Sequence, residues 1–161
     1  MNEKSIGKQF LEVAIEIERN GYNFYEAVGS RNRDKEIRDV FTQLATREKE
    51  HEHTFRDMLA RLGGYGPSLN PCEDYQYVRS LADSSVFTGE RAQTLLTKKR
   101  MTNVEAIEAG IGFEKDSIML YSEVLGMIPR QDQEIINMII NEEKKHLSEL
   151  MYIANKIRSG G

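Results

Sequence analysis

Two segments of the chain carry the same short pattern, a glutamate followed three positions later by a histidine. Glu48 and His51 interrupt one run of apolar side chains with helical spacing, and Glu143 and His146 interrupt another in the same way. Residues three apart lie on one face of a helix, so each pair can reach a single ion. Carboxylate oxygen and imidazole nitrogen are both good metal ligands, so the two pairs are candidate halves of a metal site.

Two further glutamates stand where an apolar side chain is expected. Glu18 continues one apolar stripe and Glu114 continues another. Each is followed seven residues later by a tyrosine, Tyr25 or Tyr121, and the next Glu-x-x-His pattern begins 30 residues after Glu18 and 29 after Glu114. The spacing predicts a two-fold internal repeat of helical hairpins, which would bring four helices around one centre.

A charge count indicates what such a centre would hold. Four buried carboxylates repel one another and cannot all stay ionised in apolar surroundings. Two divalent cations balance four negative charges, and two neutral imidazoles complete the ligand sets. Carboxylate oxygen and imidazole nitrogen suit iron or manganese, and zinc is also possible. The predicted ligands, which are also the candidate catalytic residues, are Glu18, Glu48, His51, Glu114, Glu143 and His146.

Other interpretations are open to these residue types. A third pattern, Glu50 to His53, has polar neighbours one turn away, so we expect it to face water. A single histidine in an apolar stripe is more often a hydrogen-bonded core group, but two pairs at matching places in a repeat favour a metal site. For Tyr25 and Tyr121, hydrogen bonding to a ligand carboxylate and ordinary aromatic packing both stay open.

The elements that must position these residues are long amphipathic helices, because apolar residues recur three and four apart over most of the chain. We expect helices at about 3–29, 32–62, 102–126 and 130–158. Gly29 and Ser30 are expected to end the first helix, and Thr102 to Glu105 has the form of a capping box that opens the third.

The connection over about 63–101 is too long for a structureless loop, so we expect a short helix within it, near 74–82. The predicted fold is all-α, a four-helix bundle of two hairpins joined by a long crossover, in a single domain over 1–161.

Composition excludes several classes of protein. With 161 residues, 39% hydrophobic and 30% charged, the chain is suited to one folded domain, and its net charge of -4 argues against nucleic-acid binding. One cysteine excludes a disulfide scaffold and an iron–sulfur centre built by this chain. The longest apolar run, 135–140, is too short to span a membrane, and 1–6 has no apolar signal region. We therefore expect a cytoplasmic protein without nucleic-acid or membrane partners.

The full set of residues resembles the ferritin-like superfamily, specifically the rubrerythrin-like di-iron carboxylate proteins. The similar segments, which with their helices cover most of the chain outside the crossover, are 18–25, 41–51, 114–121 and 143–146. The resemblance implies a ferritin-like four-helix bundle with a non-haem di-iron centre, in which Glu48 and Glu143 bridge the ions.

The chain departs from rubrerythrins in two respects. With one cysteine it cannot build their four-cysteine rubredoxin domain, so the resemblance implies a separate electron-donor protein. Some relatives carry an additional glutamate one turn from the third-helix ligand, where this chain has Ile111 and Ser117.

Three functions stay open at this point. The first is an oxidoreductase that reduces peroxide or dioxygen, the second is an iron-binding protein that oxidises Fe(II) without a peroxide substrate, and the third is a structural helical module. We also expect a homodimer, in which hairpins could be exchanged between chains.

Overall fold

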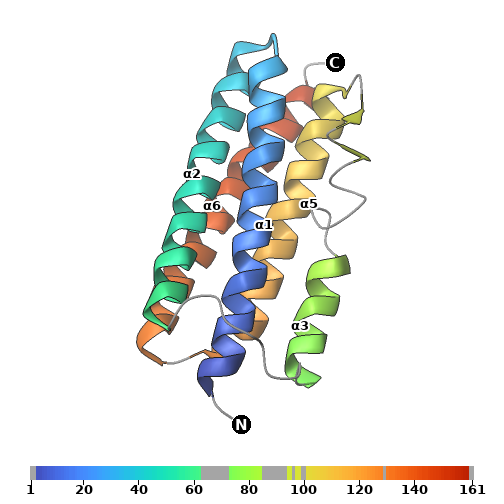
Figure 1. Ribbon diagram of the computed structural model, residues 1–161. Helices are drawn as coiled ribbons and strands as arrows, with labels where there is room; N and C mark the ends of the chain where they lie inside the picture. Colours follow the sequence, from blue (N-terminus) through green and yellow to red (C-terminus); the bar gives the residue numbers. More distant parts are fainter. Residues whose placement is uncertain are drawn as a thin grey trace.

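The computed structural model describes residues 3–62, 73–84, 94–95, 97–98, 101–128 and 130–159. Within these ranges every regular element is helical, and four long helices run side by side along the molecule (Figure 1). The predicted all-α bundle of two hairpins with a long crossover is confirmed.

The first hairpin consists of α1, Glu3–Arg31, and α2, Lys35–Arg61. The side chain of Asp34 caps α2, because its Oδ1 atom accepts hydrogen bonds from the backbone amides of Glu36 and Ile37 at 3.0 and 3.3 Å. The predicted start at 32 is therefore three residues too early.

The prediction that Gly29 and Ser30 end the first helix is wrong, since α1 continues to Arg31. A Cβ atom on residue 29 would lie 3.0 Å from Oγ1 of Thr42 and 3.2 Å from its backbone nitrogen. Glycine at this position lets the backbones of α1 and α2 approach closely, and it does not end the helix.

The second hairpin consists of α5, Asn103–Val124, the short 3₁₀ helix η1, Leu125–Met127, and α6, Arg130–Ser159. The predicted capping box is confirmed. Oγ1 of Thr102 accepts from the Glu105 amide at 3.2 Å, and Oε2 of Glu105 accepts from the Thr102 amide at 2.9 Å. The predicted third helix ran to 126, but α5 ends at Val124 and the chain tightens into η1.

The crossover contains the expected short helix, α3, Glu73–Ser84. It lies beside α1 and α5 (Figure 1), and Nη1 of Arg79 donates to Oε2 of Glu16 on α1 at 2.8 Å. The predicted loop from 63 to 71 lies outside the described residues.

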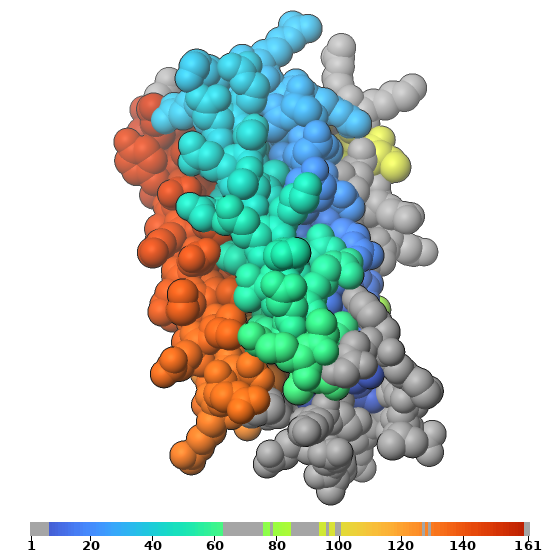
Figure 2. Space-filling view, turned by 60° about the vertical axis from the view of Figure 1, so that its left-hand side comes forward, coloured from blue at the N-terminus to red at the C-terminus, as the bar shows by residue number. Residues whose placement is uncertain are grey.

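The hairpins are arranged so that α1 and α6 run in one direction and α2 and α5 in the other (Figure 1). Figure 2 shows the face on which α2 and α6 lie side by side. This arrangement places the middle turns of the four long helices at one level, where each helix carries a buried glutamate.

Two sets of edge-to-face aromatic rings fill the core on either side of that level. Tyr25 packs against Phe24, Phe41 and Phe113 at centroid distances of 5.5, 5.5 and 5.7 Å. Toward the other end, Tyr121 packs against Phe10 and Phe55 at 6.1 and 5.4 Å. All of these rings are buried, so apolar surface borders the middle of the bundle toward both ends.

None of the helices in the described residues combines the length and the hydropathy that crossing a membrane requires.

Candidate metal centre

The six residues predicted as metal ligands come together near the middle of the bundle. The structure groups Glu18 of α1, Glu48 and His51 of α2, Glu114 of α5, and Glu143 and His146 of α6. The four glutamates have no exposed surface, and the two histidines are 3% and 6% exposed. We call these six residues the Glu/His cluster.

The cluster divides into two overlapping groups, each able to offer four ligand atoms within 4.8 Å of one another. One group is Glu18, Glu48, His51 and Glu143, and the other is Glu48, Glu114, Glu143 and His146. Glu48 and Glu143 belong to both groups, so the two groups together could hold a dinuclear metal centre.

Many buried polar atoms of the cluster lack a hydrogen-bond partner in the described part of the chain, as expected of a site that binds cations. Among the described residues, several buried atoms of the cluster have no hydrogen-bond partner: Oε2 of Glu18, both carboxylate oxygens of Glu48, Nδ1 of His51, Oε2 of Glu114 and Oε1 of Glu143. Nδ1 of His51 lies 2.9 Å from Oε1 of Glu143, yet neither atom forms a hydrogen bond. Buried polar atoms are nearly always paired, so this concentration of free acceptors is best satisfied by metal ions.

When protons alone balance the negative charge of the cluster, its carboxylates have widely separated pKa values. Burial, with the charges of Glu143 and Glu18, raises the pKa of Glu48 well above its usual range. Burial and the charge of Glu143 raise the pKa of Glu114 to about 8. Burial would also raise the pKa of Glu143, but its contacts with His146 and His51 outweigh burial and lower that pKa to about 2.

The two histidines of the cluster have raised pKa values, because carboxylates lie close to them. Burial would lower the pKa of His51, but close contact with Glu143 and Glu18 raises it to about 12. Likewise, contacts with Glu114 and Glu143 outweigh burial and raise the pKa of His146 to about 9. The cluster therefore attracts positive charge strongly, and divalent ions would compete with these protons.

Each tyrosine of the repeat hydrogen-bonds a cluster carboxylate from the opposite hairpin. The hydroxyl of Tyr25 donates to Oε1 of Glu114 at 2.6 Å, and the hydroxyl of Tyr121 donates to Oε1 of Glu18. Burial, followed by the negative charge of the partner carboxylate, raises both tyrosine pKa values well above 10. Both phenols therefore stay protonated and act as donors, which decides between the two interpretations that the sequence left open.

Sequence reasoning missed Glu142. Nε2 of His51 lies 2.9 Å from Oε2 of Glu142, while Nδ1 of the same ring faces the cluster. This contact lowers the pKa of Glu142. The sequence carries little signal for it, because Glu142 points away from the apolar stripe of α6 and the equivalent residue of the repeat is Arg47.

The third Glu-x-x-His pattern faces water, as predicted. The side chain of His53 is 79% exposed and that of Glu50 is 55% exposed. Glu50 accepts from Nη1 of Arg47 at 2.8 Å, and neither Glu50 nor His53 contributes to the Glu/His cluster.

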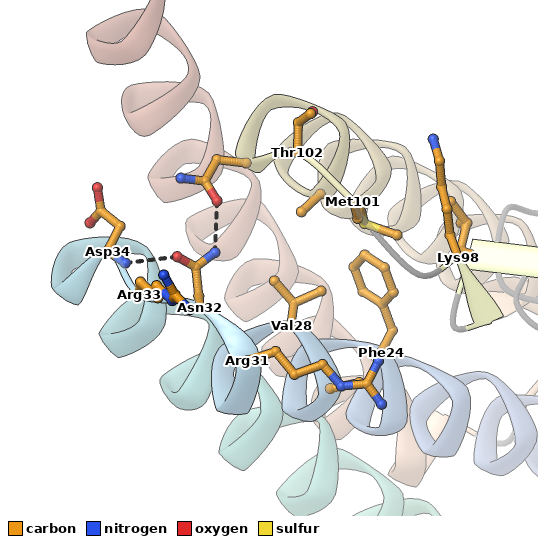
Figure 3. A pocket seen from close by; sticks show the side chains of 13 residues that line it. Phe24, Val28, Arg31, Asn32, Arg33, Asp34, Lys98, Met101 and Thr102 are labelled. Carbon is orange, nitrogen blue, oxygen red and sulfur yellow. Dashed lines mark hydrogen bonds between the residues drawn. The ribbon is translucent and has the colours of Figure 1, made fainter.

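A cavity of about 640 Å³ lies at one end of the bundle, separate from the Glu/His cluster. That cavity lies between the end of α1, including Phe24 and Val28, and the residues that lead into α5, including Met101 (Figure 3). Nδ2 of Asn32 donates to Oδ1 of Asn103 at 2.8 Å beside it, which ties the two hairpins together. No residue of the Glu/His cluster lines this cavity.

Comparison with known proteins identifies the family. A sequence model of the Rubrerythrin family matches residues 9–154. The chain belongs to this family. A crystal structure of a protein from Thermotoga maritima, described as a ferritin-like diiron-carboxylate protein, is similar over 92% of this chain and 94% of that chain, with a TM-score of 0.70 and 28% sequence identity. The comparison with curated proteins found no match.

Membership of the rubrerythrin family agrees with the geometry of the cluster. The chain has a ferritin-like fold with a buried group of glutamates and histidines that could hold a dinuclear metal centre. The family match covers all six residues of the Glu/His cluster.

Proposed function

We propose that this rubrerythrin-family protein is a di-iron oxidoreductase that reduces hydrogen peroxide or dioxygen with electrons from a separate donor protein. The observation that carries the proposal is the pair of overlapping ligand groups sharing Glu48 and Glu143. When bound there, a pair of iron ions would supply two electrons at one place, and hydrogen peroxide with two electrons and two protons becomes two molecules of water.

The residues of the chain would support this chemistry in separate ways. The six side chains of the Glu/His cluster would hold the ions, and Glu48 and Glu143 belong to both ligand groups. Tyr25 and Tyr121 hold the carboxylates of Glu114 and Glu18 from the opposite hairpin. The buried aromatic rings on both sides exclude bulk water from the centre.

One observation favours the alternative, an iron-binding protein that oxidises Fe(II) without a peroxide substrate. Some relatives carry an additional glutamate one turn from the third-helix ligand, where this chain has Ile111 and Ser117. Each ligand group of this chain offers three carboxylates and one histidine, and neither Ile111 nor Ser117 adds a carboxylate.

Two measurements test the proposal. Elemental analysis of metal-replete protein should find two ions per chain, and less than about one would favour a purely structural module. Anaerobic mixing of the iron-loaded, reduced protein with peroxide or with oxygen at equal concentration then separates the two activities. Oxidation that is faster with peroxide supports the oxidoreductase, and the reverse supports Fe(II) oxidation as the function.

The separate electron donor, the homodimer and the cytoplasmic location expected from the sequence remain predictions that go with this proposal.

A further inference from the structure

The two halves of the Glu/His cluster differ in the residue that precedes the ligand glutamate. Glu142 precedes Glu143 on α6, whereas Arg47 precedes Glu48 on α2. The internal repeat makes these two positions equivalent, so a carboxylate in one half is replaced by a guanidinium in the other. This difference changes the surroundings of the two histidines.

Both ring nitrogens of His51 lie close to carboxylates. Nε2 contacts Oε2 of Glu142 at 2.9 Å, while Nδ1 lies 2.9 Å from Oε1 of Glu143 and 3.5 Å from Oε2 of Glu18. With a metal ion in the cluster, a proton on Nε2 donated to Glu142 would leave the lone pair of Nδ1 free to face that ion. The carboxylate of Glu142 therefore covers and orients this side of the centre.

His146 is held only from the inner side. Nδ1 forms a contact of 2.9 Å with Oε2 of Glu143 and lies 3.6 Å from Oε1 of Glu48 and 3.7 Å from Oε2 of Glu114. In the described ranges no side chain hydrogen-bonds Nε2 of His146. Arg47, the equivalent of Glu142, cannot accept a hydrogen bond and instead donates to Glu50 on its own helix.

A cavity of about 170 Å³ opens between α2 and α6 beside His146, on the face seen in Figure 2. We call it the His146 cavity. The buried side chains of Leu44 and His146 line it, together with Gln43, Arg47, Lys145 and Glu149. Glu142 also lines the cavity, and His146 is the residue of the Glu/His cluster that the cavity reaches.

The volume of the His146 cavity and the charges of the residues that line it indicate what kind of molecule it can hold. Cavities for drug-sized ligands have about 300–1,000 Å³, and each water in the liquid takes about 30 Å³, so the His146 cavity suits a few small molecules. Its two cations, Arg47 and Lys145, are matched by two carboxylates, Glu142 and Glu149, and Gln43 adds a neutral donor and acceptor. Balanced charges with several hydrogen-bonding groups favour a neutral polar molecule.

We propose that the His146 cavity admits a small neutral polar molecule, hydrogen peroxide in the proposed reaction, to the His146 side of the cluster, while Glu142 keeps the His51 side closed. The identity of the molecule rests on the proposed function, but the route does not. In this arrangement Glu142 is a positioning residue that acts through His51.

The first test measures how fast a small molecule reaches the cluster, without any catalytic turnover. Nitric oxide is a small neutral probe whose binding to iron-loaded, reduced protein changes the absorption spectrum. Gln43→Trp should narrow the cavity and slow this change about tenfold, because entry then waits for side-chain motion. Gln43→Ala should not slow it, and Thr46→Trp, an exposed position on α2 outside the cavity, should match the unaltered protein. Equal rates in Gln43→Trp and Thr46→Trp would overturn the route.

The second test measures the difference between the His51 side and the His146 side of the cluster. A ferrous chelator should remove the two ions in two phases, the faster from the His146 side. Glu142→Ala should weaken the slower site by about 10–100-fold and so speed the slow phase selectively. The matched control is Glu134→Ala, an exposed glutamate on the same helix. A single phase in the unaltered protein, or an effect of Glu142→Ala on the fast phase alone, would contradict the asymmetry.

Peroxide separates this inference from the proposed function. If Gln43→Trp slows nitric oxide but the unaltered protein does not react with peroxide, the route stands and the proposed reaction fails. If peroxide is reduced at the same rate in Gln43→Trp and Thr46→Trp, the reaction stands and the route is wrong. A chain that binds no iron would overturn both.

Discussion

The hydroxyl of Tyr25, on α1, donates a 2.6 Å hydrogen bond to Oε1 of Glu114, on α5, so a residue of the first hairpin holds a carboxylate of the second. The repeat provides the reciprocal contact, in which Tyr121 of α5 donates to Glu18 of α1. These two buried contacts connect the hairpins directly at the Glu/His cluster. They tie the position of the candidate ligands to the packing of the whole bundle.

Replacing either tyrosine by phenylalanine should therefore weaken both the fold and the centre. Tyr25→Phe leaves a buried carboxylate oxygen without its donor, which should lower the free energy of unfolding by about 1–3 kcal/mol. Metal affinity should fall as well, because Glu114 loses the group that orients it. Urea unfolding and metal titration measure the two effects. Tyr22→Phe is the control, since the half-buried Tyr22 forms no hydrogen bond through its hydroxyl to any described residue. Equal behaviour of the two variants would contradict the role of the Tyr25 hydroxyl.

Metal stoichiometry should separate the shared carboxylates from the others. Glu48→Ala or Glu143→Ala removes a ligand from both groups, so each variant should lose both ions. Glu18→Ala or Glu114→Ala removes a ligand from one group and should leave the other ion in place.

Elemental analysis of the purified variants checks this pattern. Glu50→Ala should retain the full metal content, because the exposed Glu50 lies outside the cluster. Retention of two ions by Glu48→Ala would show that Glu48 does not bridge them.

Gly21 should not tolerate even a methyl group. A Cβ atom there would lie 2.5 Å from Cζ of Phe113 and 2.9 Å from Oε2 of Glu48, so Gly21→Ala must displace a core ring and a candidate ligand. We expect a loss of about 1–3 kcal/mol in the free energy of unfolding and weaker metal binding. At Gly126 a Cβ would meet nothing within 4 Å, so Gly126→Ala should change stability by less than about 0.5 kcal/mol. Similar melting temperatures for the two variants would rule out the tight contact.

The metal-free protein should lose stability as the pH rises from about 6.5 to 9. Folding raises the pKa of Glu114 from 4.5 to about 8, of His146 from 6.5 to about 9 and of His51 from 6.5 to about 12. Over this window the folded chain holds protons that the unfolded chain has released, so the free energy of unfolding falls with increasing pH. Folding lowers the pKa of Glu143 from 4.5 to about 2, so this group makes the free energy of unfolding rise with pH. That rise takes place below about pH 4.5, outside this window.

Metal loading should reverse this trend, because the ligands bind ions in their deprotonated forms. The rise in melting temperature on adding metal should therefore be larger at pH 9 than at pH 6.5. Denaturation of the metal-free and metal-loaded protein at both pH values provides the measurement. A metal-free protein equally stable at both would show that the cluster does not hold these protons.

Much of the fold was predictable because local chemistry determines it. The apolar period predicted four long helices and a short one in the crossover, and the box from Thr102 to Glu105 located the start of α5 within one residue. The boundary at Gly29 was predicted wrongly, because a glycine that ends a helix and a glycine that lets two helices touch look alike in sequence. The contact with Thr42 on α2 distinguishes them.

The sequence by itself determined the six residues of the Glu/His cluster and their two-fold repeat, because a carboxylate or imidazole on an apolar face of a helix needs a partner in the core. Only the tertiary structure decided that Tyr25 meets Glu114, that Glu142 covers His51 and that a cavity opens at His146. Periodicity along one helix reveals its buried face, but the rotation and axial shift between helices, which side-chain packing sets, decide which residues of another helix meet that face.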